Sequence, residues 1–290
     1  MSDPNLDPVD QLIELLSLER LEVDLFRGVS PDERSQRVFG GQVIGQALMA
    51  AYQTVEDRVC HSLHAYFIRP GDPNIPIIYE VDRSRDGRSF TTRRVIAIQH
   101  GKQIFNLAAS FQVPEDGFEH QMDMPEVAGP EGLKTRSALR LEAAEHFSEE
   151  TIAHFKKKRA VEMRPVNPQP LINPEPMSPD NQIWFRTTKQ IDVSPAIHQC
   201  ILAYASDMSL LDSGTRPHGL TWHEGKAVMA SLDHAMWFHA DVRTDDWLLY
   251  SQDSPSASGA RSFNRGSIYT REGKLVASVA QEGLMRPKTR

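Results

Sequence analysis

The sequence is poor in cysteine, in long apolar runs and in positive charge. Only Cys60 and Cys200 occur in 290 residues, which fits a reducing cytoplasm. No uninterrupted apolar stretch approaches the roughly 20 residues of a membrane-spanning helix, and the first residues lack the basic and apolar regions of a signal peptide. The formal net charge of −7 argues against nucleic acid as the main partner, because phosphate binding needs a surplus of Lys and Arg.

Several catalytic and metal-binding motifs are also missing. There is no Gly-x-Ser-x-Gly elbow, which leaves a Ser-His-Asp hydrolase mechanism unsupported. There is no His-Glu-x-x-His or Cys-x-x-Cys motif either, so we expect no metal and no cofactor. Cys200 lies two residues from His198, but a thiol on an apolar helix is better explained as a buried side chain than as a nucleophile.

What the sequence does contain is an internal repeat. Three short segments recur in the same order at offsets of 169, 173 and 172 residues. They are Ser62–Tyr66 with Ser231–Met236, Arg88–Phe90 with Arg261–Phe263, and Gly101–Lys102 with Gly273–Lys274. A period this long indicates two copies of one fold unit rather than a solenoid. We therefore divide the chain into a first unit (1–113), a proline-rich connector (114–180) and a second unit (181–290).

Each copy shows one apolar helix followed by several strands. We expect long helices at 42–52 and 195–211, a helix on the first unit at 7–21, and one helix in the connector at 138–155. Strand-like runs lie at 61–68, 75–82, 89–99 and 103–113 in the first copy, and at 183–188, 227–238, 247–254, 262–270 and 274–281 in the second. The turns between strands are too short for crossover helices. The predicted class is therefore α+β, with an antiparallel sheet wrapped around a buried helix in each unit.

Asp207 is the most unusual residue of the second unit. Its predicted helix carries no Lys, Arg, Asp or Glu from Val193 to Ser206, so the carboxylate follows a purely uncharged segment, and burying an unpaired charge is costly. The alternative is a helix carboxylate that reaches water or caps a loop. The repeat favours a special role, because laying Gly41–Gln42 on His198–Gln199 places Ala50 opposite Asp207.

The last strand shows the same asymmetry between the copies. Gln281 follows apolar residues, and the repeat places Ala109 opposite it. A glutamine bonded to backbone is the alternative, since a buried amide needs partners for both its ends. Ser231 opens a strand and has Ser62 as its counterpart in the repeat. A carboxylate, a hydroxyl and an amide in an apolar pocket could orient and deprotonate a water molecule, which suits hydrolysis.

At these residues the chain closely resembles the acyl-CoA thioesterase II family, the TesB-like double-hotdog thioesterases. The resemblance runs through most of the chain and rests on long strings, namely Val38–Val43, Tyr66–Asp72, Gly117–Gln121, Tyr204–Asp207, Asp233–His239 and Ala280–Gly283. It implies two hotdog units joined edge to edge and hydrolysis of acyl-CoA to a fatty acid and CoA. It also implies that Asp207, Ser231 and Gln281 are the catalytic residues. Many family members have threonine in place of Ser231, and serine keeps the hydroxyl.

The resulting hypothesis is that Asp207 acts as general base on a water held by Ser231 and Gln281. Helix 195–211 would supply oxyanion donors from its start. Arg88, Arg93 and Arg94 could meet the CoA phosphates, although solvent-facing strand arginines are common. The alternatives are a non-catalytic acyl-CoA-binding module and an enoyl-CoA hydratase. The expected partner is acyl-CoA, with neither nucleic acid nor a membrane span, in a possible homo-oligomer.

Overall fold

The computed structural model describes residues 6–31 and 37–288. The first unit contains α1 (Pro8–Leu16), β1 (Glu19–Glu22), β2 (Leu25–Gly28), α2 (Gly40–Tyr52), β3 (Val59–Phe67), β4 (Ile77–Asp86), β5 (Phe90–Gln99) and β6 (Lys102–Gln112). The connector contains η1 (Pro130–Gly132), α3 (Arg136–Glu142), η2 (Ala144–His146), α4 (Glu149–Lys156) and β7 (Val161–Pro165). The second unit contains β8 (Asn181–Thr187), α5 (Pro195–Ser206), α6 (Leu210–Thr215), η3 (Arg216–His218), η4 (Trp222–Glu224), β9 (Ala227–Ser231), β10 (Asp233–Phe238), β11 (Leu248–Ser258), β12 (Arg261–Thr270) and β13 (Leu275–Pro287).

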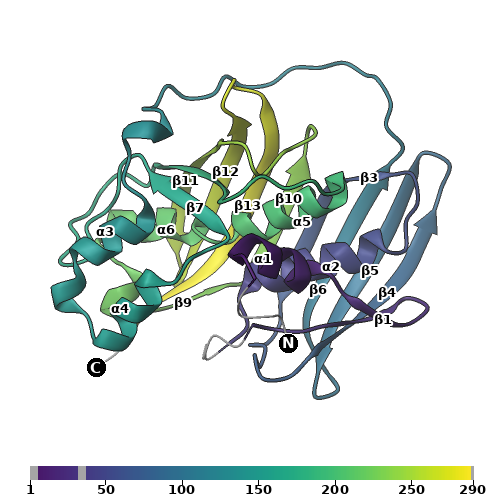
Figure 1. Cartoon of the computed structure of the whole chain (residues 1–290), viewed down its shortest axis with the longest axis horizontal. Coiled ribbons are helices and arrows are strands. Elements are labelled where there is room, and N and C mark those ends of the chain that lie inside the picture. The colour runs from purple at the N-terminus through teal and green to yellow at the C-terminus, as the bar shows by residue number, and fades with distance from the viewer. Residues whose placement is uncertain (1–5, 32–36, 289–290) are drawn as a thin grey trace.

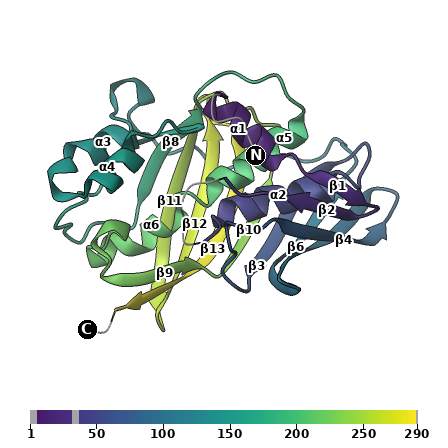
Figure 2. The ribbon, with the colours of Figure 1, turned by 60° about the horizontal axis from the view of Figure 1, so that its bottom comes forward.

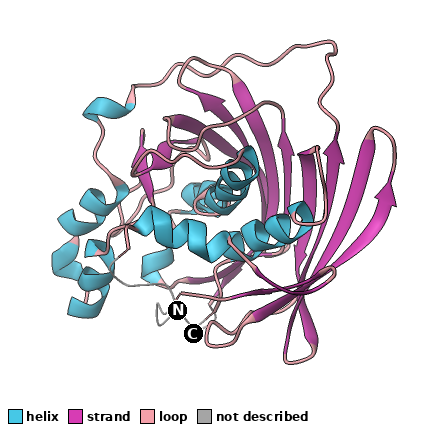
Figure 3. Cartoon of the chain, turned by 45° about the vertical axis from the view of Figure 1, so that its right-hand side comes forward, coloured by secondary structure: helices cyan, strands magenta, loops and turns pink. Residues whose placement is uncertain are grey.

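The strands of both units form one curved antiparallel sheet (Figures 1 and 3). Within the described residues its order is β1-β2-β4-β5-β6-β3-β10-β13-β12-β11-β8-β7, and β9 pairs with β13. The units meet where β3 pairs with β10, with Ala65 opposite His234. The predicted α+β class, with antiparallel strands around a long apolar helix in each half, is confirmed. The connector adds β7 to one edge of the sheet.

Helices α2 and α5 lie side by side in the concave face of the sheet, and α1 crosses both of them (Figures 2 and 3). They run antiparallel, because Gly41 near the start of α2 meets the Tyr204 carbonyl near the end of α5. Gly45 one turn later approaches the Cys200 carbonyl. A side chain at Gly41 would collide with that backbone, so the glycine is what allows the two helices to approach so closely.

Three helix predictions need correction. The helix predicted at 7–21 ends at Leu16, and Glu19–Glu22 form strand β1. The connector helix predicted at 138–155 is two short helices, α3 and α4, and the side chain of Ser148 caps the second by accepting the Thr151 N–H. The helix predicted at 195–211 ends at Ser206. Asp207 is its C-terminal cap and α6 begins at Leu210, so Asp207 lies at a helix end rather than within a helix.

The strand predicted at 227–238 is divided between β9 and β10 by a bulge. Ser231 pairs with Gly283 and Ala235 pairs with Ala280, so three residues on one strand face two on the other. The carboxylate of Asp233 stabilises the bulge by accepting the Glu282 N–H at 2.7 Å. Ser231 and His234 consequently both point to the helix side of the sheet.

The burial pattern corrects the repeat alignment by one residue. Matching His64 with His234 would pair an exposed side chain with a fully buried one. Burial matches instead when buried Leu63 corresponds to His234 and exposed Tyr66 corresponds to Trp237. Ser62 is therefore not the structural counterpart of Ser231, which lies on β9.

Candidate active site

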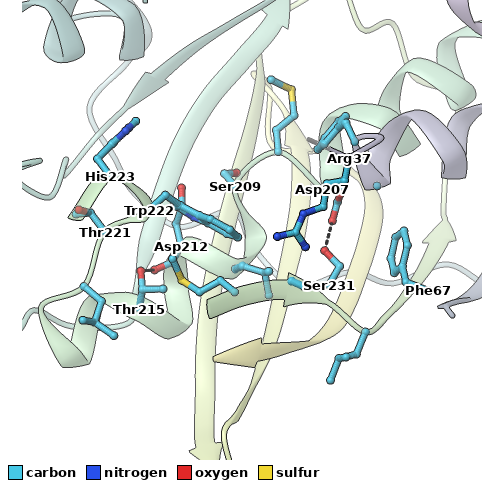
Figure 4. Close-up of a pocket in the computed structure, with 18 of the residues that line it drawn as sticks. Arg37, Phe67, Asp207, Ser209, Asp212, Thr215, Thr221, Trp222, His223 and Ser231 are labelled. Atoms are coloured by element: carbon cyan, nitrogen blue, oxygen red, sulfur yellow. Dashed lines mark hydrogen bonds between the residues drawn. The ribbon is translucent and has the colours of Figure 1, made fainter. Parts of the chain in front are cut away.

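Asp207 is placed by the end of α5, where the chain leaves the helix after buried Ser206. Its Oδ1 accepts two hydrogen bonds, from Ser231 Oγ at 3.0 Å and from Gln281 Nε2 at 2.7 Å. The hydroxyl comes from the end of β9 and the amide from the middle of β13. Figure 4 shows the Asp207–Ser231 bond inside the pocket. The three residues predicted from the sequence therefore lie in one hydrogen-bonded cluster.

The first unit reaches this cluster through the start of α2. The Gly41 N–H hydrogen-bonds to the Asp207 carboxylate. A Cβ at Gly40 would lie only 2.6 Å from Asp207 Oδ2, so glycine is what allows the carboxylate to reach the helix start. The positive end of the α2 dipole thus faces the acid. Because Asp207 caps the opposite end of α5, the start of α5 is roughly 18 Å away along a helix of twelve residues, and the oxyanion role predicted for it is wrong.

The electrostatics of the cluster favour an acid that is easily protonated. Burial raises the pKa of Asp207 to about 6, while hydrogen bonds from Gln281, Ser231 and the Gly41 backbone partly oppose this rise. Asp207 keeps some exposed surface, but that surface faces the pocket rather than the outside. A carboxylate with this pKa is mostly ionised at neutral pH and is a stronger base than an ordinary aspartate.

A cavity of about 800 Å³ opens in front of Asp207, within the size range of small-molecule sites. The first unit lines it with Phe39, Phe67 and Phe105, among others, and the second unit with Met208, Leu211 and Met229. The connector closes it with Leu139 and Leu171. Polar groups including Asp212, Thr215, Trp222 and His223 also face it (Figure 4). The cavity therefore lies between the two units and the connector.

The connector is fastened to the cavity wall by Asp212 of α6. Arg136 of α3 donates to Asp212 Oδ2 at 2.5 Å, and the Trp222 ring N–H donates to Asp212 Oδ1 at 2.7 Å. Arg136 also donates to the Met208 carbonyl, next to Asp207. The wall contributed by the connector is thus tied to the segment that carries the acid.

The three arginines predicted to meet phosphates do not line the cavity. Arg93 is 2% exposed and bonds to Thr54, Asp86 and backbone carbonyls inside the first unit, so it is unavailable to a ligand and that prediction is wrong. Arg88 and Arg94 are exposed on the β4–β5 hairpin, away from the cavity.

Other cations do line the cavity and were missed in the sequence. Arg37 and Arg69 are exposed residues of the first unit. Arg136 and Arg140 come from the connector, and Arg216, which is buried, comes from η3 of the second unit. Only Asp207 and Asp212 oppose them among the lining residues. The signal was available in part, since Arg69-Pro70-Gly71 follows a predicted strand directly.

Within the described part of the chain, no group of three or more His, Cys, Asp or Glu side chains could hold a metal ion. None of the helices in residues 6–31 and 37–288 is long and apolar enough to span a membrane.

Comparison with known proteins shows the family of the chain. Residues 30–112 match the acyl-CoA thioesterase N-terminal domain, and residues 151–284 match the acyl-CoA thioesterase family. Acyl-CoA thioesterase 2 of Haemophilus influenzae is 39% identical over 97% of this chain and 98% of its own. The crystal structure of the acyl-CoA thioesterase II TesB2 from Mycobacterium marinum is 42% identical, with a TM-score of 0.77 over 95% of this chain and 98% of that one.

A more distant structure supports the architecture alone. A protein of Alicyclobacillus acidocaldarius described as having the hot dog fold superposes with a TM-score of 0.76 over 96% of this chain and 99% of that one, at 17% identity. The chain is therefore an acyl-CoA thioesterase with two hotdog units in tandem. Within that class it belongs to the acyl-CoA thioesterase II, or TesB-like, family, whose reaction is the hydrolysis of acyl-CoA thioesters.

Proposed function

We propose that Asp207 is the general base of this thioesterase and that Ser231 and Gln281 orient it. The observation that carries the proposal is that both donors bond to one oxygen, Oδ1, which leaves Oδ2 directed at the start of α2. The remaining lone pairs of Ser231, which lines the cavity, can contact the attacking water, whereas Gln281 is fully buried and acts through Asp207. A base with a pKa of about 6 suits proton abstraction at neutral pH.

The proposed reaction has two steps. Water attacks the thioester carbonyl carbon while its proton passes to Asp207, which gives a tetrahedral oxyanion. The intermediate then collapses with cleavage of the C–S bond, and the CoA sulfur leaves and takes the proton back from Asp207. The products are CoA and a carboxylic acid, which ionises in water. Asp207 is thereby regenerated for the next cycle.

The oxyanion donors are assigned to the first turn of α2. The N–H groups at a helix start have no partner within the helix, and the helix dipole adds positive potential there. Gly40 and Gly41 lie beside the Asp207 carboxylate, so a carbonyl attacked by a water on Asp207 would be close to this turn.

The distribution of apolar and charged residues on the cavity wall supports an orientation of the substrate. Apolar residues such as Leu139, Leu171 and Leu211 suit the acyl group. Arg37 and Arg69 are exposed at the cavity, and the two segments adjoin where the Val38 N–H donates to the Gly71 carbonyl. We assign the CoA phosphates to these two arginines in place of Arg88, Arg93 and Arg94.

The proposal is tested by Asp207→Asn. This variant keeps the side-chain shape but removes the base, so kcat should fall by roughly a hundredfold to ten-thousandfold. Release of CoA thiol from an acyl-CoA, followed with a disulfide reagent, measures this rate and would not detect hydration of an enoyl-CoA. Ser231→Ala and Gln281→Ala should lower kcat with a smaller effect on KM.

Asp212→Asn is the matched control, because it removes the other carboxylate that lines the cavity. It should retain most of the turnover. An Asp207→Asn enzyme with over half of the wild-type kcat would remove Asp207 from the mechanism.

The cytoplasmic location and the homo-oligomer remain predictions.

A further inference from the structure

His234 on β10 is a fully buried histidine directly behind the proposed catalytic cluster. Its exposed fraction is 0%, and its Nε2 lies 2.9 Å from Ser206 Oγ, in the residue before Asp207. The register that pairs Ala235 with Ala280 places His234 opposite Gln281 on β13. The histidine therefore lies next to the two groups that position Asp207. One is the end of α5 and the other is the amide of Gln281.

The first unit has an apolar pair at the corresponding place. Leu63 pairs with Ala109 across β3 and β6, and both residues are fully buried. The second unit keeps the strands and the burial but replaces this pair with His234 and Gln281. Leucine and alanine pack well in this position. Burying an imidazole and an amide there instead costs free energy, because both lose their contacts with water unless they bond to each other. The pair therefore occurs in the unit that also has the acid.

Each side chain of this pair has one buried atom without another partner. Neither His234 Nδ1 nor Gln281 Oε1 has a hydrogen-bond partner of standard geometry among the described residues, and both are buried. The contact between the two side chains is nonetheless close enough for Gln281 to act as a hydrogen-bond partner that raises the pKa of His234. Leaving two buried polar atoms unpaired is costly, so a bond between them is strongly favoured.

The protonation state of His234 decides whether it can donate. Burial lowers the pKa of His234 to about 4, so the ring is neutral at the pH where the enzyme works and carries one proton. Ser206 Oγ lies 2.9 Å from both the Ala203 carbonyl and His234 Nε2, so its hydroxyl proton can point to either. If the hydroxyl donates to Nε2, the ring proton resides on Nδ1, opposite Gln281.

We propose that His234 is a positioning residue for the reaction, which donates its Nδ1–H to Gln281 Oε1 and thereby fixes the amide so that Nε2 points at Asp207. Without that donor, the amide of Gln281 can turn over and present its oxygen to the carboxylate, which repels it. The inference rests on the proposed role of Asp207 and adds a residue that acts through Gln281. The bulge at Asp233 is what places His234 on the same side of the sheet as Ser231.

The first test uses the resting wild-type protein. Nitrogen-15 NMR of labelled histidine reports which ring nitrogen carries the proton, and His234→Asn identifies the signal by its loss. The expected result is an Nδ1–H tautomer for His234. His198 is an internal control, since its Nδ1 accepts the Thr244 N–H at 3.2 Å and its proton must reside on Nε2. An Nε2–H tautomer at His234 would overturn the proposal, because Nδ1 could not donate.

The second test compares three variants by kinetics. His234→Leu removes the donor and should lower kcat by about tenfold with KM changed less than twofold, since orientation is lost while the cavity is kept. The weakened bond from Gln281 should also move the acid limb of kcat/KM to higher pH. His234→Asn, whose amide can replace the Nδ1–H, should restore most of both. His198→Leu, at the far end of α5, removes another buried histidine and should lower stability only.

The titratable groups around the cluster are left intact by these changes, including Tyr250 of β11, Arg37 ahead of α2 and Asp212 of α6. Wild-type kcat and an unmoved acid limb in a folded His234→Leu protein would refute the positioning role. Should His234→Leu not fold, a His234→Asn protein with turnover as low as that of Gln281→Ala would refute it equally. A wild-type protein without thiol release would instead refute the proposed function. The NMR measurement of the His234 tautomer would still test the bond from His234 to Gln281.

Discussion

At the scale of one residue, the buried carboxylate of Asp207, the proposed general base, lowers the stability of the folded protein when it is ionised. Its pKa of about 6 lies above the ordinary value for an aspartate because the folded protein buries the charge. The unfolded chain therefore loses this proton at lower pH than the folded one. The contribution of this carboxyl group to the free energy of unfolding is fully present below about pH 4. It is lost as the pH rises through about 6 and is absent at neutral pH.

Two pH-dependent outcomes follow for Asp207. At pH 7 the free energy of unfolding of Asp207→Asn should be about 1–3 kcal/mol higher than that of wild type. This difference should vanish near pH 4, where the wild-type carboxyl is protonated. Wild-type kcat/KM should fall as the pH drops through about 6, because the base becomes protonated. Urea unfolding and thiol release across pH 4 to 8 measure both. A stability difference that does not change with pH would contradict the assigned pKa shift.

At the scale of the element, the start of α2 combines two glycines with different tasks. Gly40 makes room for the Asp207 carboxylate, and Gly41 makes room for the backbone of α5 at Tyr204. The helix can therefore present its N–H groups to the acid of the other unit only because two successive side chains are absent. Any substitution here acts on chemistry or on helix packing according to which glycine it replaces.

Alanine substitutions separate the two tasks. Gly40→Ala should lower kcat by about tenfold or more with a small change in stability, because its Cβ displaces the side chain of Asp207, the proposed general base. Gly41→Ala should destabilise the protein by about 1–3 kcal/mol, because its Cβ meets a backbone carbonyl that cannot easily move. Gly132→Ala is the control, since no atom lies within 4 Å of its added Cβ. Equal loss of stability in the Gly40 and Gly41 variants would contradict this division.

The sequence predicted the main strands of both units but missed β1, β2 and β7, and it could not place Arg93. Alternation along a strand shows that Arg93 and Arg94 face opposite sides of the sheet, but it does not say which side is inner. Arg93 faces inward and is held by Thr54 and Asp86. Asp207 was recognisable from the uncharged segment before it, whereas its contact with Gly41 depends on how α2 and α5 pack.

At the scale of the whole molecule, both units contribute to the proposed active site. The acid, hydroxyl and amide come from the second unit, while the first unit contributes the start of α2 and one wall of the cavity. Ala109 occupies the place of Gln281 in the first unit, so a second cluster of the same kind is not formed there. Neither unit contains the whole of the chemistry.

Titration with a non-hydrolysable acyl-CoA analogue tests this arrangement. Calorimetry should saturate near one equivalent per chain. Arg37→Ala should weaken binding by about tenfold, since a charged contact to phosphate contributes about 1.5–3 kcal/mol. Arg94→Ala, an exposed strand arginine away from the cavity, should bind as wild type does. Two equivalents of equal affinity would show that the first unit carries a site of its own.

The pairing of β3 with β10 has a consequence for how such a protein can evolve. If the two halves were separate copies of one gene product, any mutation would appear on both sides of the joint. Here each half has its own stretch of gene, so the two halves can carry different side chains at matching places. Both keep an irregular register at this point, because β3 shifts against β6 between Cys60 and Ser62 as β9 and β10 shift against β13. His234 and Leu63 therefore differ in side chain and not in strand geometry, and a tandem chain can hold the acid cluster in one half while the other half supplies the facing wall.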